Sequence, residues 1–107
     1  MAHRMPEARE IVGQGPTYVT YDIDFVDPTF APGTGTPEVG GPNSWQALQV
    51  ARGLRGLDVV GADLVEVSPP YDPSGNTALI AANYLYEMLC VLPGVPQNPS
   101  RFSGLTF

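Results

Sequence analysis

The sequence has no lysine, one cysteine and one histidine among its 107 residues. All five basic residues are arginines, scattered along the chain, while 11 acidic residues bring the formal net charge to −6. No basic stripe is present to follow a phosphate backbone, which argues against a nucleic-acid-binding protein. The lone cysteine, Cys90, has no intramolecular disulfide partner, so we expect a reducing compartment and a cytoplasmic protein.

Long apolar runs and charged side chains are also scarce. No run approaches the ~20 residues that span a bilayer, and no basic segment followed by an apolar core opens the chain, so we expect no membrane association. Charged residues make up 15%, against a typical ~25%. Glycine and proline are abundant instead, with 12 of each. This composition suits an internal part of a larger α/β protein better than a free-standing small domain.

The pattern of apolar residues predicts alternating strands and helices. Residues 17–25 are rich in β-branched and aromatic side chains and predict a strand covered on both faces. A glycine- and proline-rich loop over 27–42 follows, of the length and composition typical of functional loops. A helix then begins at Asn43 or Ser44 and ends at Gly53 or Gly56.

The second half of the chain continues the alternation. Residues 57–67 predict a second strand, and a helix capped by Asn76 runs from Thr77 to about Leu92. This helix is apolar nearly all round, which predicts burial on most sides. Together with a short helix over 2–12, the order of elements indicates a βαβ unit with a parallel sheet. Two strands alone are too few to bury the last helix.

Acidic residues occupy the carboxyl ends of both predicted strands, where open α/β sheets place their sites. Asp22 and Asp24 would lie on one face of the first strand, with their Cα atoms about 6.6–6.8 Å apart. Two such carboxylates repel unless a cation coordinates them; alternatively, they only reach solvent or cap helices. Glu66 ends the second strand and either faces a cation or caps the next helix.

Other reactive side chains favour structural roles. His3 is a single histidine near the chain start and is a poor candidate ligand. Cys90 is interpreted as a packing residue of the last helix. Asp63, inside the second strand, is expected to pair with a neighbour or cap a loop.

Several motifs, in order and without a gap over residues 11–95, resemble the ureohydrolases, the arginase and agmatinase family. Residues 21–28 (YDIDFVDP) with 31–38 (APGTGTPE) resemble a metal-binding signature of that family, and 61–72 (GADLVEVSPPYD) resembles its next segment. Residues 75–79 (GNTAL) and 85–93 (LYEMLCVLP) resemble the final helix of the agmatinase and guanidinobutyrase branch.

The resemblance implies a doubly wound parallel sheet in an α/β/α sandwich, usually assembled into trimers or hexamers. It also implies hydrolysis of a linear guanidino compound, agmatine or guanidinobutyrate, to urea and an amine by a water that two Mn²⁺ ions activate. Asp22 and Asp24 would be metal ligands and Glu66 would hold the substrate guanidinium. Asp27 would fix the turn after the strand.

The resemblance covers only part of such an enzyme. The two histidines and two aspartates that complete the metal centre are absent, as is a histidine proposed to shuttle protons, so no catalytic residue is assigned here. We therefore expect residues 1–95 to be the C-terminal portion of a ureohydrolase domain, inactive alone, and residues 96–107 to be an irregular tail.

Two other functions stay open at this point. The chain could be a non-catalytic, truncated paralogue that assembles with full-length subunits through its apolar helix and sheet edge. Less in keeping with the surrounding motifs, the Asp-x-Asp pattern could be a metal–nucleotide site such as glycosyltransferases use.

Overall fold

The structure, a computed structural model, describes residues 4–96. Its elements follow the predicted order: α1 (Met5–Val12), β1 (Thr17–Asp22), the 3₁₀ turn η2 (Ile23–Phe25), α2 (Ser44–Arg52), β2 (Val59–Val65), the 3₁₀ turn η3 (Pro69–Tyr71) and α3 (Asn76–Cys90). His3 and the predicted tail from residue 97 onward lie outside the described residues.

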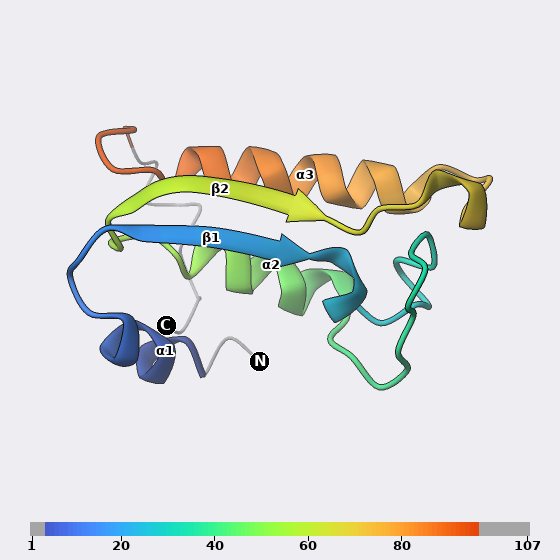
Figure 1. Cartoon of the computed structure of the whole chain (residues 1–107), viewed down its shortest axis with the longest axis horizontal. Coiled ribbons are helices and arrows are strands. Elements are labelled where there is room, and N and C mark those ends of the chain that lie inside the picture. The colour runs from blue at the N-terminus through green and yellow to red at the C-terminus, as the bar shows by residue number, and fades with distance from the viewer. Residues whose placement is uncertain (1–3, 97–107) are drawn as a thin grey trace.

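The two strands form a parallel pair, as the sequence predicts. The register runs from Tyr18 opposite Gly61 to Asp22 opposite Val65, after one irregularity between Thr17 and Tyr18. Parallel strands need a long crossover connection, which α2 and its flanking loops provide (Figure 1). Both strands therefore end at the same edge of the sheet.

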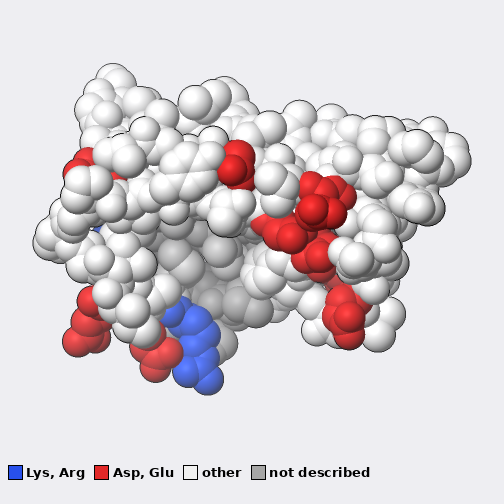
Figure 2. Space-filling view, viewed as in Figure 1, with Lys and Arg blue, Asp and Glu red and all other residues white. Residues whose placement is uncertain are grey.

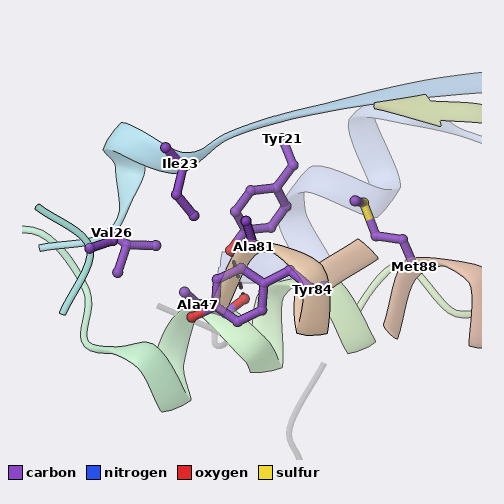
Figure 3. Close-up of a cluster of buried hydrophobic side chains, with 9 residues drawn as sticks. Tyr21, Ile23, Val26, Ala47, Ala81, Tyr84 and Met88 are labelled. Atoms are coloured by element: carbon purple, nitrogen blue, oxygen red, sulfur yellow. Dashed lines mark hydrogen bonds between the residues drawn. The ribbon is translucent and has the colours of Figure 1, made fainter. Parts of the chain in front are cut away.

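The hydrophobic core lies between one face of this sheet and the helices α2 and α3. It contains Tyr21 of β1, Ala47 of α2 and Tyr84 of α3, whose side chains meet in Figure 3. The Tyr21 hydroxyl donates to the Ala47 carbonyl at 2.7 Å, and the Tyr21 and Tyr84 rings are 5.5 Å apart between centroids. Alanines at the helix positions let both rings approach closely, so the core is compact although the sheet is small.

Helix α2 starts and stops where the sequence predicts. The Asn43 side chain accepts from the Gln46 backbone N–H, and the Gln46 side chain accepts from the Asn43 backbone N–H. This reciprocal capping box satisfies two donors that the first helical turn leaves free. Gly53 follows the last helical residue as the C-cap.

The first strand ends earlier than predicted. β1 stops at Asp22, and Asp24 lies in η2 rather than on the strand. The cause is local: the Asp22 carboxylate accepts from the Asp24 N–H at 3.0 Å, which turns the backbone out of the extended conformation. The prediction that both faces of this strand are covered is also wrong within the described residues, because Tyr18 is 61% exposed.

Helix α3 differs from its prediction in two respects. Gly75, with φ of 76°, is its N-cap, and the Asn76 side chain instead donates to the Phe30 carbonyl at 2.8 Å. The helix is also not buried on most sides: Leu79 and Leu89 are 69% and 61% exposed. One sheet face and α2 cover a single stripe of α3 and leave its other apolar side chains in contact with solvent.

Within residues 4–96, no helix combines the length and the hydropathy that a membrane span requires.

Candidate functional site

Three carboxylates gather at the carboxyl edge of the parallel sheet. Asp22 is the last residue of β1, Asp24 lies in the turn after it, and Glu66 directly follows β2. Because Asp22 is in register with Val65, the backbones of Asp22 and Glu66 are close across the strand pair. Figure 2 shows acidic side chains grouped over the ends of the strands, with the basic side chains on this face lying elsewhere. The structure therefore brings together the three acids that the sequence singled out.

Asp22 and Asp24 are held by different hydrogen bonds. One oxygen of Asp22 accepts from the Asp24 N–H, and Oδ2 of Asp24 accepts from the Thr36 hydroxyl at 2.8 Å. These contacts orient two half-buried carboxylates at the end of the strand. Sequence reasoning missed Thr36, because nothing in a glycine- and proline-rich loop marks which of its threonines turns back toward the strand end.

Partial burial raises the pKa of Asp22 above its ordinary value. The negative charges of Asp24 and Glu66 raise it further, while the hydrogen bond from the Asp24 backbone opposes them. The two neighbouring acids thus disfavour the ionised form of Asp22, as expected for a carboxylate grouped with others without a cation. A bound cation would reverse this effect.

Glu66 has an unusual backbone conformation. Its φ is 72°, and among residues 4–96 it is the only non-glycine residue with positive φ. The left-handed conformation ends β2 and leaves the side chain exposed at the sheet edge. Such strain in a non-glycine residue is concentrated at functional sites, so it supports a role for this side chain.

The loop 27–42 wraps around the acids and is fixed at both ends by Asp27. Its carboxylate accepts from the Thr29 N–H at 2.9 Å and the Gly40 N–H at 3.0 Å. The Thr29 hydrogen bonds in particular lower the pKa of Asp27. Gly41 passes so close to η2 that an added Cβ would lie 2.7 Å from the Phe25 carbonyl oxygen. The hydrogen bonds of Asp27 are those expected of a residue that fixes the turn after the strand.

A second set of contacts holds the middle of the same loop. Asp72 accepts from both the backbone and the hydroxyl of Thr77, and the Thr77 hydroxyl accepts from the Gly33 N–H. Sequence reasoning missed this set. An available signal was the Asp-Pro-Ser-Gly turn before the last helix, since such an Asp often accepts from the first amides of a helix.

Asp63 makes the contacts with neighbours that the sequence predicts. Asp63 accepts from the Tyr18 hydroxyl at 2.7 Å and the Thr20 hydroxyl at 2.6 Å, so it pairs with neighbours on β1. These bonds, with that from Thr20 first, lower the pKa of Asp63. Cys90 is half-buried at the end of α3.

The acids fit part of a metal centre and not all of one. Carboxylate oxygens suit divalent manganese, but such an ion takes about six ligands, with imidazole common among them. Across the described part of the chain, no group of three or more His, Cys, Asp or Glu side chains is arranged to hold a metal ion. Any centre built on Asp22 and Asp24 needs further ligands.

Comparison with known proteins identifies the family. The family model for the arginase family matches residues 1–90. The chain belongs to the arginase family. It is 65% identical over 91 residues to a guanidinobutyrase of Pseudomonas aeruginosa, covering 85% of this chain and 28% of that protein. It is 62% identical over 91 residues to a mitochondrial agmatinase of Gallus gallus, covering 85% of this chain and 27% of that protein.

Solved structures agree in fold. A hypothetical agmatinase from Burkholderia thailandensis matches with a TM-score of 0.78 and 52% identity, over 81% of this chain and 27% of that one. The two strands and three helices are thus part of an arginase-like α/β fold, as the sequence predicts. The chain spans little more than a quarter of the length of the relatives it matches.

Proposed function

We propose that this chain is part of a manganese-dependent hydrolase that converts a linear guanidino compound, agmatine or guanidinobutyrate, into urea and an amine. The observation that carries the proposal is the grouping of Asp22, Asp24 and Glu66 at one sheet edge of an arginase-family chain. Relatives named for guanidinobutyrate and for agmatine support this substrate class.

Each acid has a separate role in the proposal. Asp22 and Asp24 would hold manganese, which when bound lowers the pKa of a coordinated water and stabilises developing negative charge. Glu66 would accept two N–H bonds from the planar guanidinium, for which a carboxylate is the natural partner. Asp27 would keep the loop 27–42 closed around the acids through its bonds to Thr29 and Gly40.

The chain would correspond to the C-terminal portion of the complete enzyme. The order of its motifs supports this placement, whereas its length relative to its relatives indicates only that it spans part of such an enzyme. The remaining metal ligands would come from the other portion, and the complete enzyme would assemble as a trimer or hexamer. The proposal therefore expects no urea release from these 107 residues alone.

A chimera tests the proposal directly. The matching 91-residue segment of the Pseudomonas guanidinobutyrase is replaced by the corresponding residues of this chain, and urea release is measured with Mn²⁺ and each substrate. We expect activity from the chimera and none from the 107-residue chain. An inactive chimera that is folded and binds Mn²⁺ contradicts the proposed reaction, and an active isolated chain contradicts the proposed incompleteness.

Variants of the chimera test the assigned roles. Asp24→Asn should lower activity by about 100-fold or more, since even outer-shell partners of metal ligands contribute 10–100-fold. Glu66→Gln should raise KM by about 30-fold, because the guanidinium loses a charged partner. Glu10→Gln, at an exposed acid of α1 outside the candidate site, is the matched control and should change neither. Equal effects at Glu10 and Glu66 would contradict the guanidinium role.

The exposed side of α3 favours one alternative, a non-catalytic chain that assembles with full-length subunits. Leu79, Tyr86 and Leu89 are exposed, and the one charged residue of the helix, Glu87, is buried. This alternative expects the chain to co-purify with a complete ureohydrolase. A cooperatively folded monomer that does not bind a complete ureohydrolase would contradict this alternative.

A further inference from the structure

We propose that Asp72 and Thr77 are positioning residues for the candidate site: they anchor Gly33, and through it they hold the loop 27–42 so that Thr36 reaches Asp24. The inference rests on the proposed function, which it deepens by adding the residues that keep the metal-ligand region in place. Neither residue contacts the three acids in any bond described above, so their effect on the site passes through the loop.

The bonds between Asp72 and Gly33 have a fixed direction. Oδ2 of Asp72 accepts from the Thr77 backbone N–H at 2.7 Å and from the Thr77 hydroxyl at 2.6 Å. A hydroxyl has a single proton, and the Thr77 hydroxyl donates that proton in its hydrogen bond to the Asp72 carboxylate. The Thr77 oxygen can therefore only accept in its other hydrogen bond. It accepts from the Gly33 N–H at 2.9 Å. Asp72 and Thr77 are 7% and 1% exposed, so water competes little for these bonds.

Gly33 is held from its other side as well. Its carbonyl accepts from the Ser68 N–H at 2.6 Å. A Cβ on Gly33 would lie 2.9 Å from the Cβ atoms of both Asp72 and Thr77, closer than side chains tolerate. Only a glycine allows this approach, which joins the middle of the loop to the connection between β2 and α3.

This junction links the two sides of the candidate site. Three residues beyond Gly33, the Thr36 hydroxyl donates to Asp24 at 2.8 Å. On the other side, Ser68 is two residues beyond Glu66, the strained residue at the end of β2. Fixing Gly33 therefore sets the position of the loop that contacts Asp24 relative to the segment that carries Glu66.

The chain offers a matched control. Thr34 is as buried as Thr77, at 2% exposed, and lies next to Gly33 in the same loop. Its hydroxyl is buried without a hydrogen-bond partner, whereas that of Thr77 has two. Thr34→Val and Thr77→Val remove the same atom from neighbouring sites, but only the second breaks the proposed contacts.

The first experiment measures amide hydrogen exchange by NMR in the metal-free 107-residue chain. Thr77→Val should speed exchange of the Gly33 and Ser68 amides by about tenfold or more relative to core amides such as that of Tyr84. The Thr36 side chain should then populate several χ1 rotamers, detectable from its three-bond couplings. Thr77→Ser, which keeps the hydroxyl, and Thr34→Val should leave both measurements within about twofold of the parent.

Several outcomes overturn the proposal. Unchanged exchange at Gly33 and Ser68 in Thr77→Val does so, and so does equal acceleration at every amide, which marks a purely structural role. If Thr77→Val does not fold, Asp72→Asn, which keeps one acceptor oxygen, must produce the same local pattern more weakly. A uniform change or no change in that variant is then the contrary result.

The second experiment measures Mn²⁺ affinity in the chimera. Thr77→Val should weaken it by about tenfold, as for other residues that orient metal ligands, with Thr77→Ser restoring it and Thr34→Val unchanged. Unaltered affinity in Thr77→Val overturns the link to the metal region. If the proposed function is wrong, the parent chimera releases no urea. The hydrogen-exchange result in the metal-free chain does not depend on that outcome, so the two failures can be told apart.

Discussion

At the scale of single residues, Glu66 combines an unfavourable backbone conformation with a charged side chain at the sheet edge. A non-glycine residue at φ of 72° costs about 1–3 kcal/mol when the surrounding structure imposes it. Glycine, which has no Cβ, would adopt this positive φ more easily, so folding alone does not explain a glutamate here. A site that needs a carboxylate at this point does explain it.

Exchanging this residue should separate stability from function. Glu66→Gly removes the strain and should raise the free energy of unfolding of the chain by up to about 1 kcal/mol, while abolishing guanidinium binding in the chimera. The control Glu38→Gly, at a residue without positive φ, should instead lower it by about 0.5–1 kcal/mol. Urea denaturation of the two variants checks the signs, and a destabilised Glu66→Gly would contradict the strain argument.

Asp72 should make the free energy of unfolding of the chain depend on pH in the acidic range. Hydrogen bonds from Ser74 and Thr77 lower the pKa of Asp72 to about 2, from about 3.9 in an unfolded chain. Since the folded pKa is the lower one, the contribution is complete above about pH 4 and is lost as pH falls toward 2. Acidification should therefore lower the stability of the folded chain.

Denaturation at pH 5, 4, 3 and 2 measures this contribution. The stability difference between the parent chain and Asp72→Asn should be constant down to about pH 4 and shrink toward pH 2. Asp58→Asn, at an exposed acid, serves as the control for removing one charge. Parallel curves for parent and Asp72→Asn would show that the carboxylate is not held as described.

At the scale of elements, one ion pair joins α2 to α3. The Arg52 guanidinium donates two bonds to Glu87, at 3.1 and 3.2 Å, and the side chains are only 15% and 5% exposed. Arg52 also lies 5.6 Å from the Trp45 ring centroid. Both side chains are largely withdrawn from water, so the ion pair offsets part of the cost of burying the two charges.

Breaking this pair from one side should be costly. Arg52→Met leaves Glu87 buried without its guanidinium and should lower the free energy of unfolding by about 3–5 kcal/mol, whereas Arg52→Met with Glu87→Leu should recover most of it. The exposed pair Arg4–Glu7 is the matched control, and Arg4→Met should cost less than about 1 kcal/mol. Similar costs at the two pairs would contradict the argument from burial.

At the scale of the whole molecule, the described chain has more apolar surface than its elements cover. β2 pairs with β1 alone in the described sheet, and beside it an open groove of about 330 Å³ includes Val60, Leu85 and Leu89. These three side chains are 66%, 41% and 61% exposed. An unprotected strand edge next to an apolar groove is a surface on which other protein segments pair.

The isolated chain should therefore bind a hydrophobic dye and associate as its concentration rises. Replacing Leu79 and Leu89 by serine should reduce both effects and change the free energy of unfolding by less than about 1 kcal/mol, because the side chains are exposed. Dye fluorescence and sedimentation across concentrations measure the change. A monomer that binds no dye would contradict this description of the surface.

The order of the elements and the acids at the sheet edge could be predicted from the sequence alone. Strand composition, the Asn43 cap and the turn residues are local signals, and the parallel arrangement brings the strand ends together, so Asp22 and Glu66 could be placed at one edge without coordinates. The family motifs add the expected roles of the acids, and the comparisons establish the arginase family.

Which face of α3 is covered and what holds the acids in position depend on the tertiary structure. The end of β1 is a local outcome that the residue pattern did not reveal, because the Asp22 side chain competes with the strand for the Asp24 amide. The bonds from Thr36 to Asp24 and from Gly33 to Thr77 join residues 12 and 44 positions apart. Partners so distant are chosen by how the elements pack, because short polar side chains in a loop have many possible partners until folding brings one within reach.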